Sequence, residues 1–304
     1  MNTTVVLASQ GQLGSLILRR LRSDGHRAVG VDQDICDLEN PDSIRALFAR
    51  FPGMTRLFNA AAFTAVDAAE SQPRKTFRTN ALGPGLLALC CASRGIGLVH
   101  FSTDYVFGSG HAEPIPEQAV PRPMSVYGRS KLLGEKLVLE NHPGAFVLRS
   151  CGLYSAHRPN FVRTMVRLGL QRTSIEVVSD QQVTPTSADA LAKVAVELAD
   201  NASPGLYHAT AQGECSWYQF AQAIFETLGM DVPLTPVDSS KWPAAAPRPE
   251  YSVLDNCLLR REGLDTFRSW RAELTGFLEA HGGLLLEEEA RKLEGSSAGS
   301  IEVR

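Results

Sequence analysis

The stretch TVVLASQGQLGS, residues 4–15, decides the fold, because an apolar run leads directly into a glycine-containing turn. Gly11 and Gly14 have the spacing of the last two glycines of a dinucleotide-binding turn, and Ala8 stands in place of the first. A strand that ends in such a turn and opens a helix directs backbone N–H groups at a pyrophosphate. Alanine fits the first position if that residue does not need a positive φ. Alone, the turn is equally typical of a plain strand-to-helix connection.

Five apolar runs typical of β-strands alternate with helix-length segments through the first half of the chain. They are TVVLA (4–8), RAVGVD (27–32), RLFNAAA (56–62), GLVHFST (97–103) and AFVLRS (145–150). Strands without polar alternation, joined through helices, indicate a parallel sheet covered on both faces, which is a doubly wound α/β fold. We expect a Rossmann dinucleotide-binding domain at residues 1–150, a smaller C-terminal substrate-binding lobe at 151–286 that can exchange elements with it, and a charged, flexible tail at 287–304.

Composition argues against several classes of protein. With 304 residues, 44% of them hydrophobic, the chain can bury a large core. Its net charge of −3 and its scattered Lys and Arg residues provide no basic surface for nucleic acid. The six cysteines form no CxxC pair, so they predict reduced thiols in a cytoplasmic protein and no zinc site. No apolar segment reaches the roughly 18 residues of a membrane span, so we expect no membrane partner.

A carboxylate follows the second expected strand. Asp32 lies about 20 residues after the turn, where dinucleotide folds have an acid that accepts from an adenosine ribose hydroxyl. A solvated loop acid is an equally good interpretation of this residue. As a ribose ligand, its carboxylate repels a 2′-phosphate and favours NADH over NADPH.

The segment SVYGRSKLLGEKL, residues 125–137, places a tyrosine and a lysine one helical turn apart. Tyr127 and Lys131 then share a helix face. A phenol has a pKa of about 10, and a nearby ammonium lowers that pKa by favouring the phenolate. The tyrosine can therefore exchange a proton with a carbonyl or carbinol oxygen. Ser102 and Thr103 end an expected strand, and their hydroxyls can donate to the same oxygen.

Together these features resemble the dTDP-4-dehydrorhamnose reductase family of extended short-chain dehydrogenases/reductases over about residues 3–285. The matching segments are GQLG (11–14), NAAAFTAVDAAE (59–70), NALGPGLLA (80–88), STDYVFG (102–108), YGRSKLLGE (127–135), NFVRTM (160–165), SDQQVTPT (179–186), GLYHATAQGECSWYQFAQAIF (205–225) and RPEYSVLDN (248–256). The resemblance implies reduction of the 4-keto group of a dTDP-4-dehydro-6-deoxy-L-sugar by NADPH or NADH. Such a reaction belongs to deoxysugar biosynthesis for a polysaccharide or an antibiotic.

The resemblance also implies a role for residues in the matching segments. Tyr127 would protonate the sugar C4 oxygen, Lys131 would tune it and hold the nicotinamide ribose, and Thr103 would complete the triad. The implied cofactor-binding residues, together with Asp32, are Gly11, Gln12, Leu13, Gly14, Asp37, Leu38, Ala61, Ala62, Thr64, Asn80, Tyr127 and Lys131. The implied substrate-binding residues are Val66, Thr103, Asp104, Tyr105, Phe107, Gly152, Trp217 and Arg248. For Val66, Phe107 and Trp217, a place in the core is the alternative, because apolar side chains usually lie there.

The chain departs from the family pattern in three places. Ala8 replaces a glycine, which puts cofactor affinity in doubt. Where the family has Thr-Ser-Trp after a strand, this chain has Ser150, Cys151 and Gly152, so a large pocket wall is missing. We hypothesise a wider sugar site for a branched or rearranging sugar, as in a dTDP-dihydrostreptose-type synthase, with Gly152→Trp as the test. Leu16 stands where some members have an acidic metal ligand, so we expect no bound Mg²⁺ there.

Cofactor choice and two other functions stay open on sequence. The resemblance favours NADPH, whereas Asp32 favours NADH. A regulatory subunit, resembling the β subunit of methionine adenosyltransferase, would bind a dinucleotide without turnover, but the intact triad argues against it. An NDP-sugar epimerase shares the fold and the triad, and the matching segments after residue 150 argue against it. The partner we expect is a dTDP-activated 4-keto-6-deoxysugar, bound by a monomer or a homodimer.

Overall fold

In the computed structural model, which describes residues 2–296, the central element is a parallel sheet. Its strands within that range, in spatial order, are β2 (Ala28–Val31), β1 (Thr3–Leu7), β3 (Met54–Asn59), β4 (Gly97–Thr103), β5 (Phe146–Ser150) and β10 (Gly205–His208). Every neighbouring pair in the sheet is parallel. The predicted doubly wound α/β fold is therefore confirmed, and each of the five predicted strands corresponds to one strand of the sheet.

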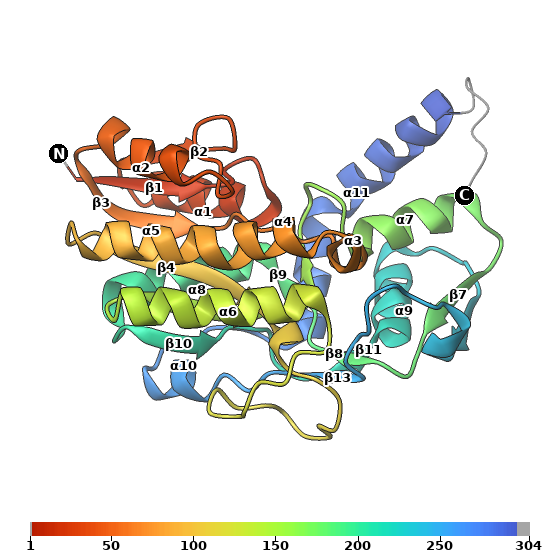
Figure 1. Ribbon diagram of the computed structural model, residues 1–304. Coiled ribbons are helices and arrows are strands. Elements are labelled where there is room, and N and C mark those ends of the chain that lie inside the picture. The colour runs from red at the N-terminus through yellow and green to blue at the C-terminus, as the bar shows by residue number, and fades with distance from the viewer. Residues whose placement is uncertain (1, 297–304) are drawn as a thin grey trace.

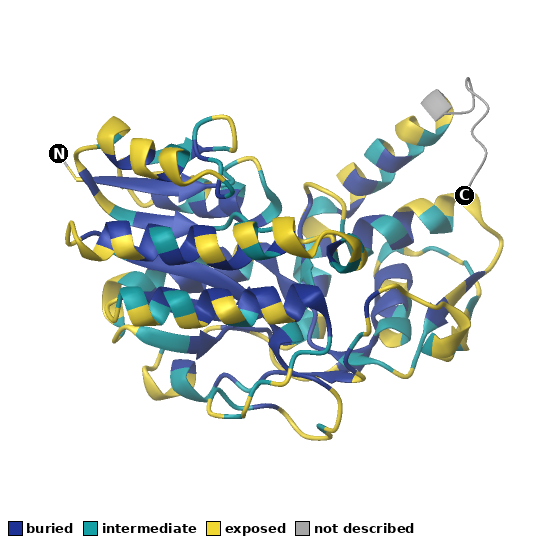
Figure 2. Ribbon diagram, viewed as in Figure 1, coloured by how far each residue is buried: buried dark blue, intermediate teal, exposed yellow. Residues whose placement is uncertain are grey.

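Helices cover both faces of this sheet (Figure 1). The helices α2 (Pro41–Arg50), α5 (Gly83–Ala92) and α6 (Val126–Asn141) lie on one face, while α1 (Gln12–Ser23) and α8 (Ala188–Asn201) pack together on the other. Val5 and Val6, which are neighbours in β1, belong to two different hydrophobic cores. Burial on both faces explains why the strand shows no polar alternation. Figure 2 shows the sheet as a buried layer beneath partly exposed helices.

The second half of the chain builds a smaller lobe beside the sheet. Its helices α7 (Phe161–Gln171), α9 (Trp217–Leu228) and α11 (Trp270–Ser296) share a core rich in aromatic residues. Short strands complete it: β7 (Ile175–Val178) pairs with β12 (Leu234–Val237), β8 (Gln182–Val183) with β11 (Cys215–Ser216) and β13 (Tyr251–Ser252), and β6 (Leu153–Tyr154) with β9 (Thr186–Ser187).

The chain crosses between the two parts. From the second half, β10 completes the sheet and α8 completes one helical layer, with α10 (Cys257–Arg261) beside β10. Residues 287–296 of the expected flexible tail continue α11, and Glu289 is buried there against Arg163 of α7. Residues 297–304 lie outside the described residues. A boundary at residue 150 between independently folding units stays a prediction.

The carboxyl ends of the strands form the edge where ligands bind in this fold. β1 lies between β2 and β3, and the chain leaves β1 and β3 toward opposite faces of the sheet, which is a topological switch point. The short segments at this edge are α3 (Val66–Ser71), α4 (Pro73–Phe77), the π-helical turn η1 (Arg78–Leu82), the 3₁₀ turn η2 (Asp104–Val106) and, from the lobe, η3 (Ser239–Lys241). Among the described residues, no helix combines the length and the apolar character that crossing a bilayer needs.

Candidate functional site

The turn between β1 and α1 forms a cradle of backbone donors. A Cβ added at Gly14 would lie 2.1 Å from the carbonyl oxygen of Ala8, so only glycine fits that position. The N-cap of α1 is Gly11, which has no side chain to satisfy the N–H groups of the first helical turn. These free donors and the positive end of the helix dipole suit a bound phosphate.

Ala8 adopts a backbone conformation that glycine favours. Its φ is 54°, so the condition under which we expected alanine to be tolerated is not met. A left-handed conformation costs an L-residue roughly 1–2 kcal/mol. The turn nevertheless closes, because the N–H of Gly11 donates to the carbonyl of Ala8 at 2.8 Å. The alanine therefore adds strain to the turn and leaves its donors in place.

Asp32, directly after β2, is tied to the same turn. One carboxylate oxygen accepts from the Ser9 hydroxyl at 2.7 Å, and the other accepts from the backbone N–H of Gln10 at 3.0 Å. Asp32 is therefore not a free, solvated loop acid. It braces the turn, and a ribose hydroxyl would have to share its oxygens with these two donors.

A groove of about 400 Å³ lies at the switch point; we call it the switch-point groove. It is lined by Ala8, Gln10, Gly11, Asp32, Gln33, Cys36, Asp37, Leu38, Glu39, Ala61, Ala62, Phe63, Lys75, Thr79 and Arg158. The structure thus brings together six residues predicted to bind the cofactor: Gly11, Asp32, Asp37, Leu38, Ala61 and Ala62. They come from three separate segments of the chain, which is what binding an extended dinucleotide requires.

Four other predicted cofactor residues have side chains outside the groove. Gln12 donates to the carbonyl of Leu153 at 3.1 Å, and Leu13 is buried in the core, so both can offer a ligand only backbone N–H groups. Thr64 is exposed between β3 and α3. Asn80 is fully buried in η1, where its amide exchanges hydrogen bonds with the backbone of Phe63 at 2.8 and 3.0 Å. Asn80 therefore holds a groove-lining residue in place and does not line the groove itself.

The predicted triad assembles at the carboxyl end of β4. Tyr127 and Lys131 lie one turn apart near the start of α6, and Thr103, whose hydroxyl lies close enough to influence the phenol of Tyr127, ends β4. The Lys131 ammonium donates to the carbonyl of Phe101 at 2.6 Å. Ser125 caps α6 by accepting from the N–H of Gly128 at 3.0 Å, which fixes where the helix begins. The cap and the strand end together set the positions of the three side chains.

Burial controls the protonation of this centre. It raises the pKa of Tyr127 to about 12, against the opposing effect of the hydrogen bond with Thr103. It lowers the pKa of Lys131 to about 8, against the opposing effect of the Glu135 carboxylate. We expected Lys131 to lower the pKa of Tyr127, but burial outweighs any such effect. At neutral pH Tyr127 is a phenol, which is the form that can donate a proton.

Ser102 and Asp104, the neighbours of Thr103 in the sequence, line neither the switch-point groove nor the second pocket, which is described below. Ser102 points to the opposite face of β4 and donates to Glu135 at 2.5 Å, so its hydroxyl does not join Thr103 as we expected. Asp104 is buried and accepts from the Thr103 hydroxyl at 2.9 Å, and burial raises its pKa. The structure therefore places Asp104 behind the triad as an orienting group, rather than among the residues that line the nearby pocket described next.

A second pocket, of about 650 Å³, lies between the sheet edge and the lobe. Its lining includes Tyr105, Phe161, Trp217, Trp242 and Arg248, so it contains three of the predicted substrate-binding residues. Arg248 forms a two-point ion pair with Asp67 at the start of α3, at 2.8 and 3.3 Å. The backbone N–H of Ala246 donates to the same carboxylate at 3.0 Å, so one acid fastens the lobe's long loop over this pocket.

The other predicted substrate residues divide between the site and the core. Val66 packs against the small cluster that contains Tyr127, beside the triad. Gly152 has a φ of 55°, and a Cβ there would lie 3.6 Å from the Trp217 ring and 3.2 Å from Pro185, so this ring already fills part of the space that we expected to be open. Phe107 is 1% exposed in a separate cluster, so its predicted contact with substrate is corrected to a place in the core.

Comparisons with known proteins identify the family. A family model described as "RmlD substrate binding domain" matches residues 1–282. A dTDP-4-dehydrorhamnose reductase from Mycolicibacterium smegmatis is 35% identical over 274 residues, which are 89% of this chain and 83% of that protein. One from Streptomyces griseus is 37% identical over 278 residues, 89% of this chain and 91% of that protein. The chain belongs to the dTDP-4-dehydrorhamnose reductase family.

Solved structures of the family agree with this fold. The dTDP-4-dehydrorhamnose reductase from Clostridium acetobutylicum superimposes with a TM-score of 0.89 at 36% identity, covering 92% of this chain and 99% of that one. The Bacillus anthracis reductase, solved in complex with NADP, gives a TM-score of 0.88 at 33% identity, covering 91% of this chain and 99% of that one. The resemblance that the sequence motifs indicated is thereby confirmed.

The residues of this reductase-family member fit a nicotinamide dinucleotide. The glycine cradle, the uncapped N-terminus of α1 and the switch-point groove are all present. The triad lies at the carboxyl end of β4, the strand next to β3 in the sheet. Sequence reasoning missed Asp67 and Arg158, because a single acid or base outside a motif carries no pattern of its own. It also missed the buried pair between Glu135 and Arg149, joined at 2.7 and 2.8 Å beneath the triad.

Proposed function

We propose that this protein catalyses the NAD(P)H-dependent reduction of the 4-keto group of a dTDP-4-dehydro-6-deoxy-L-sugar, in deoxysugar biosynthesis. The observation that carries the proposal is the position of Tyr127. Its ring meets the ring of Tyr105, which lines the second pocket, edge-on at 5.6 Å. Phe63, which lines the switch-point groove, packs against the small cluster that contains Tyr127. A proton donor between a dinucleotide groove and a substrate pocket is what a ketoreductase needs.

In this proposal Tyr127 is the general acid. A cofactor in the switch-point groove would supply hydride to C4 of the sugar. The phenol of Tyr127 gives its proton to the C4 oxygen, so the carbonyl becomes a secondary alcohol and the tyrosine becomes a phenolate. The Lys131 ammonium, one helical turn away, stabilises the negative charge that develops on the Tyr127 oxygen. The Thr103 hydroxyl, which donates to Asp104 at 2.9 Å, lies beside the phenol and helps to orient it.

The second pocket supports a nucleotide-linked sugar as the substrate. The rings of Trp217 and Phe161 lie 4.7 Å apart and offer an aromatic surface for a flat pyrimidine base. Arg248 adds a guanidinium, which suits a diphosphate. Val66 and Tyr105 border the triad on this side, so we assign them to the sugar.

The proposal is tested by offering the purified protein dTDP-4-dehydro-L-rhamnose, generated in situ, with NADPH or NADH. We expect loss of the reduced nicotinamide absorbance that depends on the sugar. Tyr127→Phe keeps the ring and removes the proton, so we expect kcat to fall about 10²-fold or more while dinucleotide binding persists. Undiminished turnover by Tyr127→Phe would contradict the assignment of the acid. Dinucleotide binding without turnover in the parent protein would favour a regulatory subunit.

The finer assignments are also proposals. Relatives from Streptomyces niveus and Streptomyces antibioticus, 36% and 37% identical, are named as deoxysugar ketoreductases, which supports an antibiotic pathway. A wider sugar site, and with it a dTDP-dihydrostreptose-type product, rests on Gly152. Because the φ of Gly152 is positive, Gly152→Trp has to be compared with Gly152→Ala, which adds the same backbone strain without a ring. We further propose a cytoplasmic enzyme that acts as a monomer or a homodimer.

A further inference from the structure

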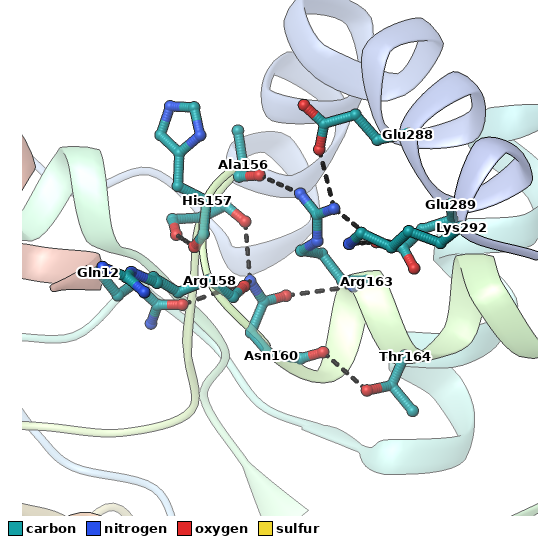
Figure 3. A network of polar contacts seen from close by, with 11 residues as sticks. Gln12, Ala156, His157, Arg158, Asn160, Arg163, Thr164, Glu288, Glu289 and Lys292 are labelled. Atoms are coloured by element: carbon teal, nitrogen blue, oxygen red, sulfur yellow. Dashed lines mark hydrogen bonds and ion pairs between the residues drawn. The ribbon is translucent and has the colours of Figure 1, made fainter. Parts of the chain in front are cut away.

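Arg158 lies where the lobe meets the switch-point groove. Its loop is fastened to the phosphate-binding turn, since Gln12 donates to the carbonyl of Leu153 at 3.1 Å and accepts from the Asn160 amide at 3.3 Å. Figure 3 shows this loop lying against Gln12. The φ of Arg158 is 69°, a conformation that residues other than glycine rarely adopt. Such strain persists only where the surroundings hold the residue in place, and it gathers at ligand-binding positions.

The side chain of Arg158 lines the switch-point groove and binds Gln10, another lining residue. Its Nε donates to the carbonyl of Gln10 at 2.8 Å, and the backbone N–H of Gln10 donates to Asp32 at 3.0 Å. The guanidinium is therefore linked through Gln10 to the acid expected at the adenosine ribose position. An arginine has five donors, and within residues 2–296 the structure gives this one a hydrogen bond through Nε alone. Its two Nη groups form a planar fork that matches a phosphate.

The charges in the groove make this arginine distinctive. The described lining has three acids, Asp32, Asp37 and Glu39, and two bases, Lys75 and Arg158. The Lys75 ammonium lies 3.9 Å from the Glu39 carboxylate and 5.8 Å from the centre of the Phe63 ring. The oxygens of Asp32 already accept from Ser9 and Gln10. An additional phosphate on the ribose would thus meet a carboxylate engaged by two donors, and a guanidinium bound to Gln10, which would offset the negative charge.

We propose that Arg158 binds the adenosine 2′-phosphate of NADPH and so makes this protein select NADPH over NADH. An arginine beside the ribose position is the usual way in which a dinucleotide fold accommodates that phosphate. The inference rests on the proposed function only in that the groove holds a nicotinamide dinucleotide. It does not depend on which sugar, if any, is reduced.

The test is a direct binding titration of NADPH and of NADH, followed by the fluorescence of the reduced nicotinamide without any sugar. The variants are Arg158→Gln and Arg158→Gly, with Lys75→Gln as the control for a general loss of charge from the same groove. We expect both Arg158 variants to raise the Kd for NADPH about tenfold or more and to change the Kd for NADH less than about twofold. Lys75→Gln should change the two Kd values by equal factors.

Arg158→Gly also separates binding from folding. Glycine accepts the positive φ without strain, so the melting temperature of this variant should not fall below that of the parent. Equal losses of NADPH and NADH affinity, or no loss, would overturn the inference. If the proposed function is wrong and the inference about Arg158 is right, the protein will bind NADPH selectively but will not reduce the sugar. A parent protein that binds neither dinucleotide would overturn both.

Discussion

The strained alanine at position 8 shows how one side chain can limit a turn that is otherwise complete. The φ of Ala8 is 54°, and its carbonyl accepts from Gly11. Ala8→Gly removes a left-handed cost of roughly 1–2 kcal/mol. Glycine gives back about 0.4–1 kcal/mol through the entropy of the unfolded chain. We expect the variant to gain about 0.5–1 kcal/mol in the free energy of unfolding, measured by urea denaturation.

A matched control for Ala8→Gly lies six residues on. Gly14→Ala would push its Cβ against the carbonyl oxygen of Ala8, 2.1 Å away, so we expect it to destabilise the protein and weaken dinucleotide binding. If Ala8→Gly lowered stability, the left-handed conformation of Ala8 would be contradicted.

At single residues, the sequence predicted chemistry better than it predicted contacts. The acid at Asp32 and the pair Tyr127 and Lys131 follow from spacing, and all three lie at the sheet edge as expected. Spacing carries no information about which hydroxyl on β4 faces the site, so Ser102 was misplaced. Phe107 could not be told from a core residue, because an aromatic side chain suits both environments. The φ of Ala8 is set by the closing of the turn, which only the folded backbone shows.

At the scale of elements, α6 organises the centre. Tyr127, Lys131 and Glu135 recur every four residues and share one face of the helix. Two glycines let α6 approach its neighbours closely: an added Cβ at Gly128 or at Gly134 would lie 2.1 Å from the carbonyl oxygen of Tyr105 or of Asn80. The backbone of α6 therefore packs directly against η2 and η1, and this close packing fixes the positions of Tyr127 and Lys131.

The pH dependence of activity should report on Lys131. Burial lowers the pKa of Lys131 to about 8, so its side chain is an ammonium below that pH and a neutral amine above it. We expect kcat/KM to fall as the pH rises through about 8, because the charge that stabilises the Tyr127 phenolate is lost. Lys131→Arg keeps its charge at every accessible pH, so its lower activity should show no such fall. An identical alkaline limb in both proteins would assign the titration to another group.

Elements were easier to predict than the connections between them. Each strand of the first half is a local apolar run, so the five predicted strands were found. The return of β10 and α8 to the sheet depends on contacts between residues far apart in sequence, which local patterns do not contain. The π-helical turn η1 is stabilised by hydrogen bonds from the Asn80 side chain to Phe63 and Ser130, which are distant in sequence. No local sequence pattern predicts this turn.

At the scale of the whole molecule, the C-terminal helix is linked to the dinucleotide site through α7. Arg163 of α7 donates to Glu288 of α11 at 2.8 Å and pairs with the buried Glu289. The cap of α7 is Asn160, whose amide also reaches Gln12 beside the phosphate-binding turn (Figure 3). One network therefore runs from Glu288 and Glu289 of α11 to the start of α1, and these two acids lie in the segment whose charged composition predicted flexibility.

Deleting residues 287–304 tests whether this link is structural. The deletion removes both acids, each of which accepts from the Arg163 guanidinium, together with the turns of α11 beside it, so we expect a loss of about 1.5–3 kcal/mol in the free energy of unfolding. Adding Arg163→Met to the shortened chain should recover part of that loss, because an apolar side chain of similar length needs no counter-charge. Deleting residues 297–304 alone keeps both acids and serves as the control. Equal stability of all these chains, measured by urea unfolding, would show that the acids of α11 contribute nothing and that the tail behaves as its composition suggests.

The same chains test whether the link reaches the dinucleotide site. If the shortened chain binds NADPH more weakly, and Arg163→Met restores both its stability and its NADPH affinity, the effect extends through Asn160 to the phosphate-binding turn.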